Sequence, residues 1–355
     1  MSEGGVVSMD AFDYELPSER IAQYPTPHRE ESRLLIVDRK TGSWRDAEFP
    51  DLVEALVPGD LLIVNDTRVF PARLFALRSS GAKVELLLAR PLDDTDPERA
   101  SGRTWEALVR PARKARPGER LTLLSRDGRP ALEAWAEITG TREDSGMRAL
   151  ELDVPAPAWE WISKHGHVPL PPYIDRDDEP SDRERYQTVY AAHRGAIAAP
   201  TAGLHLTPGL LNRLKDRGIE SATLTLHVGP GTFRPVSAER AEDHTMDAEW
   251  IDVPEATADA VARTRQGGNR VVAVGTTTVR ALESSNRQGW TDLFIRPGHE
   301  FRSVDALVTN FHLPRSTLLL LVAAFAGTEL VLDAYRHAVE SGYRFYSYGD
   351  AMLIV

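Results

Sequence analysis

The sequence contains no cysteine among its 355 residues. This absence excludes disulfide bonds, thiolate nucleophiles and cysteine-ligated metal sites, and it fits a reducing cytoplasm, where we expect the protein to work. Long apolar runs are missing too, since the longest, Leu318–Ala326, has about half of the roughly 20 residues that a membrane span needs. The first twenty residues also lack the apolar core of a signal peptide, so we predict no contact with a membrane.

Positive charge is the minority sign, with 42 lysines and arginines against 53 acidic residues and a net charge of −11. This balance argues against a protein that coats nucleic acid by bulk attraction, although a local patch can oppose the global sign. One stretch does so, because between Arg103 and Arg129 eight cations accompany three anions, a net charge of +5. Such a run is either an ordinary solvated face or a nucleic-acid contact.

A chain of this length is expected to form two domains. From residue 59 to residue 154 short strand-like runs follow one another, separated by turn formers and without a helical segment. This pattern predicts an inserted small β-barrel domain. Its expected strands are Asp60–Asn65, Arg73–Leu77, Val84–Ala89, Trp105–Val109, Arg120–Leu124, Leu132–Ile138 and Arg148–Val154.

Strands and helices alternate in the remainder, residues 1–58 and 155–355, which we expect to form an α/β catalytic domain with a parallel sheet. Thr207 and Pro208 open one helix, and Ser316 caps an apolar one. The other expected helices are 255–266, 277–286 and 329–340, and the expected strands are 33–38, 222–228, 270–274, 306–309 and 343–354. The fold class is therefore α/β, with a parallel-sheet domain that carries the barrel as an insertion.

The junction between the strand ending at Val274 and the next helix is the clearest sign of a ligand site. Gly275 allows close backbone approach, and Thr276 or Thr277 can cap the helix while free amides point outward. Such a junction can bind a phosphate or a carboxylate, and a capped helix without a ligand is the alternative. A helix end contributes only about 0.3–1 kcal/mol, so this feature alone cannot hold a cofactor.

Several loops of the α/β region carry histidines beside small residues. His205 ends an Ala-Pro-Thr-Ala-Gly-Leu-His loop, and His227 precedes a Gly-Pro-Gly turn directly after a strand, where ligands dock in α/β sheets. Each histidine could serve as an acid or a base, or could simply be a satisfied structural residue. His244, His312 and Asp350 lie in comparable loops, and no spacing among them matches a zinc signature.

Two arginines flank a rigid proline in the segment Asn65-Asp-Thr-Arg-Val-Phe-Pro-Ala-Arg73. Arg68 and Arg73 could hold a phosphate or carboxylate, or form surface salt bridges. From the residues alone, the chain is best interpreted as an enzyme that acts on an anionic ligand.

Taken in order, these segments resemble the S-adenosylmethionine:tRNA ribosyltransferase-isomerase family of queuosine biosynthesis, over nearly the whole chain. The resemblance rests on Asp13–Pro17, Arg33–Leu35, Asn65–Leu74, Gly166–Ile174, Glu184–Tyr190, Ala199–His205, Leu226–Phe233, Val274–Arg280, Thr309–Pro314 and Tyr348–Met352. Asp247 stands where the family has a second histidine in its Asp-His-x-Met-His-x-Glu segment, and the loop Asp93–Arg103 is longer than usual.

The resemblance implies a reaction on tRNA that carries preQ1 at the wobble position. The ribosyl carbons of S-adenosylmethionine would be transferred and rearranged into an epoxycyclopentanediol, giving epoxyqueuosine-tRNA, adenine and methionine. S-adenosylmethionine is then a co-substrate, the nucleophile is the aminomethyl group of the base, and no metal is needed. We expect a monomer.

The resemblance also implies roles for particular residues. Proton transfer falls to His205, His227, His244 and His312, with His205 and His227 ranked first, and Asp350 pairs with an amino group. S-adenosylmethionine is held by Thr201, Gly229, Gly231, Thr232, Gly275, Thr276, Thr277 and Arg280. Transfer RNA is held by Arg68, Arg73, Arg110, Arg113, Lys114, Arg116 and Arg120.

Two other classes stay open. An S-adenosylmethionine-dependent RNA methyltransferase would release S-adenosylhomocysteine, but its glycine-rich loop after the first strand is not evident. A non-catalytic RNA-binding protein could rely on the barrel alone, but this leaves the histidine- and threonine-rich loops unexplained.

Overall fold

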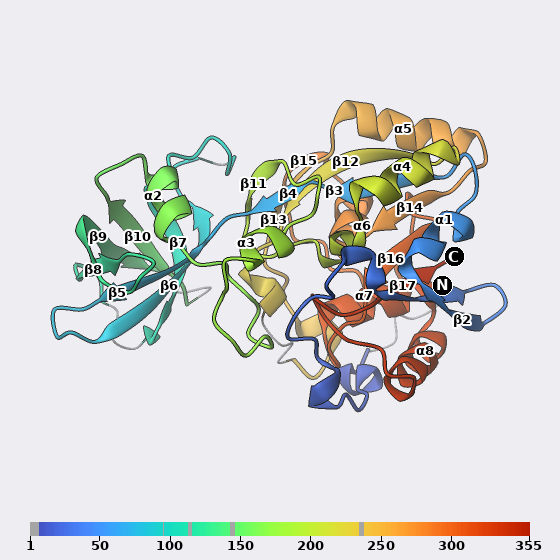
Figure 1. Ribbon diagram of the computed structural model, residues 1–355, viewed down its shortest axis with the longest axis horizontal. Coiled ribbons are helices and arrows are strands. Elements are labelled where there is room, and N and C mark those ends of the chain that lie inside the picture. Colours follow the sequence, from blue (N-terminus) through green and yellow to red (C-terminus); the bar gives the residue numbers. More distant parts are fainter. Residues whose placement is uncertain (1–6, 95, 113–115, 143–145, 234–237) are drawn as a thin grey trace.

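The structure of the protein is a computed structural model, which describes residues 7–94, 96–112, 116–142, 146–233 and 238–355. A large sheet with helices around it occupies one end of the molecule, and a smaller strand-rich body occupies the other (Figure 1). The strands Arg33–Asp38 and Ala351–Ile354, which come before and after the smaller body in the sequence, both belong to the large sheet, so the smaller body is an insertion (Figure 1). The predicted α/β fold with an inserted barrel is confirmed.

The large sheet has nine strands and is mixed, not parallel throughout. Its order is β15 (Gln288–Thr291), β13 (Glu249–Asp252), β12 (Glu220–His227), β3 (Leu61–Asn65), β14 (Val271–Val274), β16 (Ala306–Asn310), β17 (Ala351–Ile354), β1 (Arg33–Asp38) and β2 (Ser43–Glu48). The central strands β12, β3, β14 and β16 are parallel, as are β17 and β1. Antiparallel neighbours at both edges and at the β16–β17 step make the sheet mixed.

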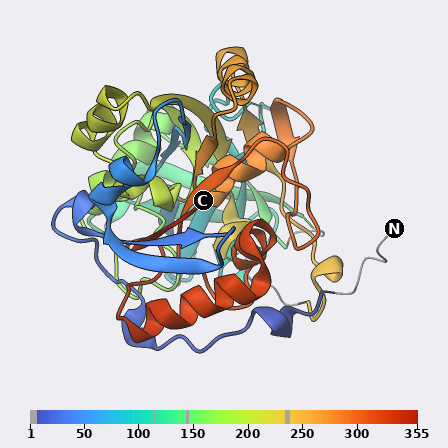
Figure 2. The same ribbon diagram turned by 90° about the vertical axis from the view of Figure 1, so that its right-hand side faces the viewer.

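Helices lie around the large sheet, as the view turned by 90° in Figure 2 shows. They are α1 (Leu52–Ala55), α3 (Asp182–Arg185), α4 (Pro208–Asp216), α5 (Glu255–Gln266), α6 (Thr276–Glu283), α7 (Thr317–Ala326) and α8 (Thr328–Glu340). The predicted caps are confirmed, because Thr207 accepts a hydrogen bond from the Leu210 amide and Ser316 one from the Leu319 amide. Within the described ranges no single helix is long and apolar enough to cross a membrane, and α7 and α8 pass that test only together, across a 115° bend.

The inserted body is a closed barrel of six strands. They are ordered β10 (Arg148–Asp153), β7 (Thr104–Arg110), β6 (Lys83–Pro91), β5 (Arg73–Leu77), β8 (Arg120–Leu124) and β9 (Pro130–Thr141). The helix α2 (Ala158–His165) follows β10, and its Trp161 and Ile162 belong to the apolar core of the barrel around Trp105. Six of the seven predicted barrel strands are therefore confirmed.

The seventh predicted barrel strand was assigned to the wrong body. β3 pairs with β12 and β14 in the large sheet, and every one of its residues is buried. An unbroken apolar run is typical of a strand covered on both faces, whereas β5 alternates between buried and half-buried residues as a barrel strand does. We propose that the inserted domain begins near Arg73 and includes α2, and not that it spans residues 59–154.

Two segments join the barrel to the sheet and run side by side. Outgoing Arg73 and returning His167 exchange backbone hydrogen bonds of 3.2 and 2.9 Å. Gly166 is required here, because a Cβ on it would lie 2.0 Å from the Pro71 carbonyl oxygen. The paired segments fix where the barrel sits relative to the large sheet.

Candidate active site at the carboxyl edge of the sheet

Four loops with predicted site residues leave the large sheet at one edge. The parallel strands β3, β12, β14 and β16 end there at Asn65, His227, Val274 and Asn310. In open α/β sheets ligands bind outside the carboxyl ends of parallel strands. The fold therefore gathers segments that lie far apart in the sequence.

His205 is fully enclosed at this edge. It ends the short helix Thr201–His205, where its Nδ1 lies 2.7 Å from Ser32 Oγ and its Nε2 lies 3.2 Å from Asn310 Nδ2. Asn310 also donates to the carbonyl oxygens of Tyr346 and Asp350. Burial, followed by the charges of nearby arginines, lowers the pKa of His205 to about 3. The imidazole is therefore neutral at pH 7.

His227 is held in the same manner at the end of β12. Its Nδ1 lies 2.7 Å from Thr67 Oγ1, and its ring packs so closely on Gly195 that a Cβ there would lie 2.6 Å away. Burial, and to a lesser degree the charge of His193, lowers its pKa to about 3. Among the described residues none is found to hydrogen-bond its Nε2.

The other two candidate histidines differ in their surroundings. His312 Nε2 lies 2.8 Å from Thr309 Oγ1 just after β16, and burial lowers its pKa to about 3. His244 is half-buried beyond another short helix, edge-on to Phe294, and its pKa is lowered mainly by burial. His205, His227 and His312 thus share the carboxyl edge, and His244 lies on the long connection from β12 to β13.

The predicted anion-binding junction opens α6. Gly275 has a φ of 92°, which a residue with a side chain rarely adopts, and its amide donates to Val308. Asn65 Nδ2 donates to Thr277 Oγ1 over 3.2 Å, and the Thr278 hydroxyl donates to the Val274 carbonyl oxygen. Thr277 stays half-exposed, whereas Thr276 is buried. A ligand at this junction would meet Gly275 and Thr277.

Arg280 lies one turn further along α6 and is buried in an ion pair with Glu249 of β13. The other Glu249 oxygen accepts the Gly229 amide over 2.8 Å, so the pair ties the loop after β12 to α6. Arg280 Nε donates to the Leu293 carbonyl, and its Nη2 has no hydrogen-bond partner among the described residues. The guanidinium therefore retains donor capacity for a ligand carboxylate.

The Asp350 carboxylate accepts hydrogen bonds from the backbone. Its two carboxylate oxygens accept the Arg33 and Arg344 amides over 3.0 and 2.8 Å. Burial raises its pKa, although these hydrogen bonds act in the opposite sense. Asp350 thus fixes the start of β17 beside β1, and this geometry supports an anchoring role more than the predicted pairing with a substrate amine.

The turn after His227 lies close to Asp247, the residue that departs from the family pattern. A Cβ on Gly231 would lie 2.7 Å from Asp247 Oδ2, so this glycine allows Asp247 to pack against the turn. Thr232 follows in the short helix Pro230–Phe233. Thr201, Gly229 and Gly231 are half-exposed at the same edge.

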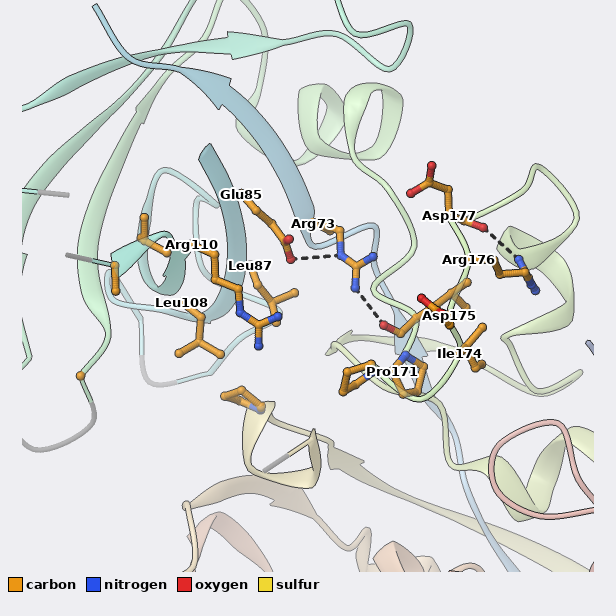
Figure 3. A pocket seen from close by; sticks show the side chains of 16 residues that line it. Arg73, Glu85, Leu87, Leu108, Arg110, Pro171, Ile174, Asp175, Arg176 and Asp177 are labelled. Atoms are coloured by element: carbon orange, nitrogen blue, oxygen red, sulfur yellow. Dashed lines mark hydrogen bonds and ion pairs between the residues drawn. The ribbon is translucent and has the colours of Figure 1, made fainter. Parts of the chain in front are cut away.

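A cavity of about 690 Å³ lies between the barrel and the sheet domain (Figure 3). Arg73 and Arg110 line it from the barrel, and Pro230 lines it from the loop after β12. Arg73 donates to the Leu170 carbonyl and forms a 3.4 Å ion pair with Glu85. The structure thus brings two predicted tRNA residues to a hollow that the candidate cofactor loop also borders.

The other predicted tRNA residues are dispersed. Arg116 is exposed, and exposed Arg120 pairs with Asp153 over 3.1 Å while stacking on Trp135. Arg68 is exposed on the short strand β4 (Thr67–Val69) and does not line the cavity at Arg73. Arg113 and Lys114 lie outside the described residues.

Sequence reasoning assigned no role to three residues that organise the edge, namely Ser32, Asn65 and Thr67. Asn65 alone bonds the backbone of Thr67, both backbone groups of Leu226 and the Thr277 hydroxyl. A polar residue at the end of an apolar strand was the available signal. With β3 predicted as a barrel strand, this signal indicates a position in the barrel and not at the edge of the large sheet.

Comparison with known proteins decides the family. The model of the queuosine biosynthesis protein family matches residues 9–354. The chain belongs to the queuosine biosynthesis protein family. Curated relatives named S-adenosylmethionine:tRNA ribosyltransferase-isomerase include one from Geobacter metallireducens, 49% identical over 98% of this chain and 99% of its own, and one from Heliobacterium modesticaldum, 50% identical over 97% and 98%.

A member of the queuosine biosynthesis family with a crystal structure has the same fold. The S-adenosylmethionine tRNA ribosyltransferase of Thermotoga maritima is 40% identical, with a TM-score of 0.53 over 97% of this chain and 100% of its own. Among the described residues no three histidine or acidic side chains are grouped to hold a metal ion.

Proposed function

We propose that the protein transfers and isomerises the ribosyl group of S-adenosylmethionine onto preQ1 at the wobble position of tRNA. The products are epoxyqueuosine-tRNA, adenine and methionine. The observation that carries this function is the convergence of the family loops at one sheet edge, beside a cavity that Arg73 and Arg110 line.

The substrates supply most of the reactivity. The sulfonium of S-adenosylmethionine acidifies the adjacent C–H, so a modest base suffices to start ring opening. The preQ1 amine then forms a new C–N bond as adenine and methionine leave, which explains how a chain without a cysteine nucleophile can catalyse the transfer. The protein must hold the two substrates, exclude water and move protons.

His205 and His227 are the groups that we propose for proton handling. Burial keeps both neutral at pH 7, and their lowered pKa makes them weak bases whose protonated forms are strong acids. His227 is the better placed of the two, because Thr67 orients its Nδ1 while Nε2 has no partner in the described part of the chain. His205 is bonded at both ring nitrogens, which favours a positioning role for it.

S-adenosylmethionine would lie along the edge between the loops after β12 and β14. Gly275, Thr277 and the spare donor of Arg280 face its carboxylate or ribose in this proposal, and Thr201, Gly229 and Gly231 leave room for it. Transfer RNA would enter over the cavity at Arg73 and Arg110. We also propose that the protein works in the cytoplasm as a monomer, which size-exclusion chromatography with light scattering would test.

Product analysis separates the proposed reaction from its alternatives. The full-length protein is incubated with S-adenosylmethionine and preQ1-bearing tRNA, and small molecules are identified by mass spectrometry. Equal amounts of adenine and methionine support the proposal. S-adenosylhomocysteine would instead indicate a methyltransferase, and tRNA binding without any product would indicate a binding module.

A further inference from the structure

A second cavity, of about 600 Å³, lies on another side of the connection between the two bodies. It is lined by β4, by β11 (His193–Ala196), by α2 and by the start of α3. None of the four histidines proposed for proton transfer lines it. Its lining includes three arginines, namely Arg68, Arg183 and Arg194.

Two of these arginines are neighbours across a strand pair. β4 and β11 are parallel, with Arg68 in register with Arg194, so their side chains leave the same face. Arg68 is exposed, and neither guanidinium forms an ion pair with any residue that the structure describes. Burial lowers the pKa of Arg194, the nearby negative charge of Glu98 acts against this, and the charge of Arg68 acts in the same direction as burial. Like charges placed together need a counter-charge.

The two acidic residues that line the cavity, Asp182 and Glu98, already accept hydrogen bonds from other groups. Asp182 is held bidentately by Arg176 over 2.7 and 2.8 Å. Glu98 accepts from His193 Nδ1 over 3.0 Å and from the Arg194 amide over 3.2 Å. Arg183 donates hydrogen bonds only to carbonyl oxygens among the described residues, at Ser163 and Gly166, and Asp178 acts on it as a nearby negative charge. The lining therefore has an excess of positive charge.

Trp159 of α2 makes this arrangement rigid. The Arg194 guanidinium carbon lies 3.9 Å from the centre of the Trp159 ring, and Trp159 Nε1 donates to the Ala100 carbonyl over 2.7 Å. A stacked guanidinium loses less freedom when it binds a ligand than a free side chain does.

We propose that the cavity lined by Arg68 and Arg194 is a phosphate-binding subsite for the backbone of the tRNA substrate, separate from the cavity lined by Arg73 and Arg110. The two guanidinium groups would bind one phosphodiester, which matches their fork geometry and offsets the excess of three arginines over two acidic residues in the lining. This inference rests on the proposed function, because it assumes that the substrate is tRNA. The subsite positions the substrate and takes no part in bond making.

The test compares Arg68→Gln and Arg194→Gln with Arg263→Gln, a control that removes an exposed cation from α5. Adenine release is measured against the concentration of preQ1-bearing tRNA at several salt concentrations. Each cavity variant is expected to raise KM for tRNA about tenfold with kcat unchanged, and to reduce the slope of log affinity against log salt by about 1. The control is expected to match the wild type.

Wild-type KM and salt slope in both cavity variants would overturn the subsite while leaving the proposed function intact. A wild-type protein that releases no adenine would instead overturn the proposed function. If Arg194→Gln unfolds because it loses its stacking on Trp159, Arg68→Gln decides the matter alone, because Arg68 is exposed and its loss breaks no ion pair among the described residues.

Discussion

Burial sets the chemistry of the histidines at the sheet edge. His205, His227 and His312 all have a pKa of about 3, and each has a hydroxyl within 2.8 Å of a ring nitrogen. A neutral, buried imidazole is a directional hydrogen-bonding group whose orientation depends on that hydroxyl. The hydroxyl partners are therefore as informative to mutate as the histidines.

Thr67 offers the cleanest test at this scale. Thr67→Val keeps the shape of the side chain but removes the hydroxyl 2.7 Å from His227 Nδ1. The unfolding free energy is expected to fall by about 1–3 kcal/mol, because a buried polar group loses its partner. The kcat for adenine release is expected to fall at least about tenfold, or ~1.4 kcal/mol of barrier. Thr67→Ser, which keeps the hydroxyl, is the matched control, and equal rates in the two variants would contradict a role for His227.

At the scale of elements, the Glu249–Arg280 pair links β13, α6 and the loop after β12. Glu249→Gln leaves the Arg280 cation buried without a counter-charge, so we expect a loss of about 3–5 kcal/mol in unfolding free energy, measured by urea denaturation. The double variant Glu249→Leu with Arg280→Met removes both charges and is expected to regain most of that stability. If Arg280 holds S-adenosylmethionine, the double variant folds but shows no thermal shift with it. A shift equal to that of the wild type would exclude Arg280 from the cofactor site.

Elements with strong local signals were predictable from the sequence, and those set by long-range pairing were not. The caps Thr207 and Ser316 and the helix Glu255–Gln266 follow from turn chemistry and periodicity, which are local. The predicted strand Asp60–Asn65 is a strand over Leu61–Asn65, but it belongs to the large sheet and not to the barrel, because its partners β12 and β14 come more than 150 residues later. The same limit hid the partners of Glu249, because Gly229 and Arg280 lie on other elements.

The site residues show the same difference between local signals, which the sequence reveals, and long-range contacts, which it does not. The loops at the carboxyl edge follow from their position after apolar strands, so His227 and Gly275 could be proposed from the sequence. The engagement of Asp350 by the Arg33 and Arg344 amides depends on how β17 docks beside β1, which no local pattern encodes. The roles of these residues in the reaction stay predictions.

At the scale of the whole molecule, one carboxylate fastens the barrel to the returning segment. Asp178 accepts from His167 Nδ1 at 2.7 Å, from the Val168 amide at 3.0 Å and from Arg126 of the barrel at 2.9 Å. Burial alone would raise the pKa of Asp178, but these hydrogen bonds and charges outweigh it and lower the pKa to about 2. The barrel is thus held to residues 166–178 by a contact that needs an ionised Asp178.

A pH titration of stability tests this contact. Because the folded pKa lies below the ordinary value of 3.8, the stabilisation is complete above about pH 4 and is lost as the pH falls towards 2. Asp178→Asn is expected to be less stable than the wild type by up to about 2 kcal/mol at pH 5, and the gap is expected to close near pH 2. A gap that stays constant across this range would show that the charge of Asp178 does not contribute.

The central claim is that the ribosyl carbons of S-adenosylmethionine end on the tRNA base. The most direct measurement uses S-adenosylmethionine labelled with ¹³C in the ribose, with the full-length protein and preQ1-bearing tRNA, followed by nuclease digestion and mass spectrometry. The account predicts that all five labelled carbons appear on the preQ1 nucleoside, while adenine and methionine are released without label. Label that stays with the adenine, or a gain of a single unlabelled methyl group on the tRNA, would contradict it.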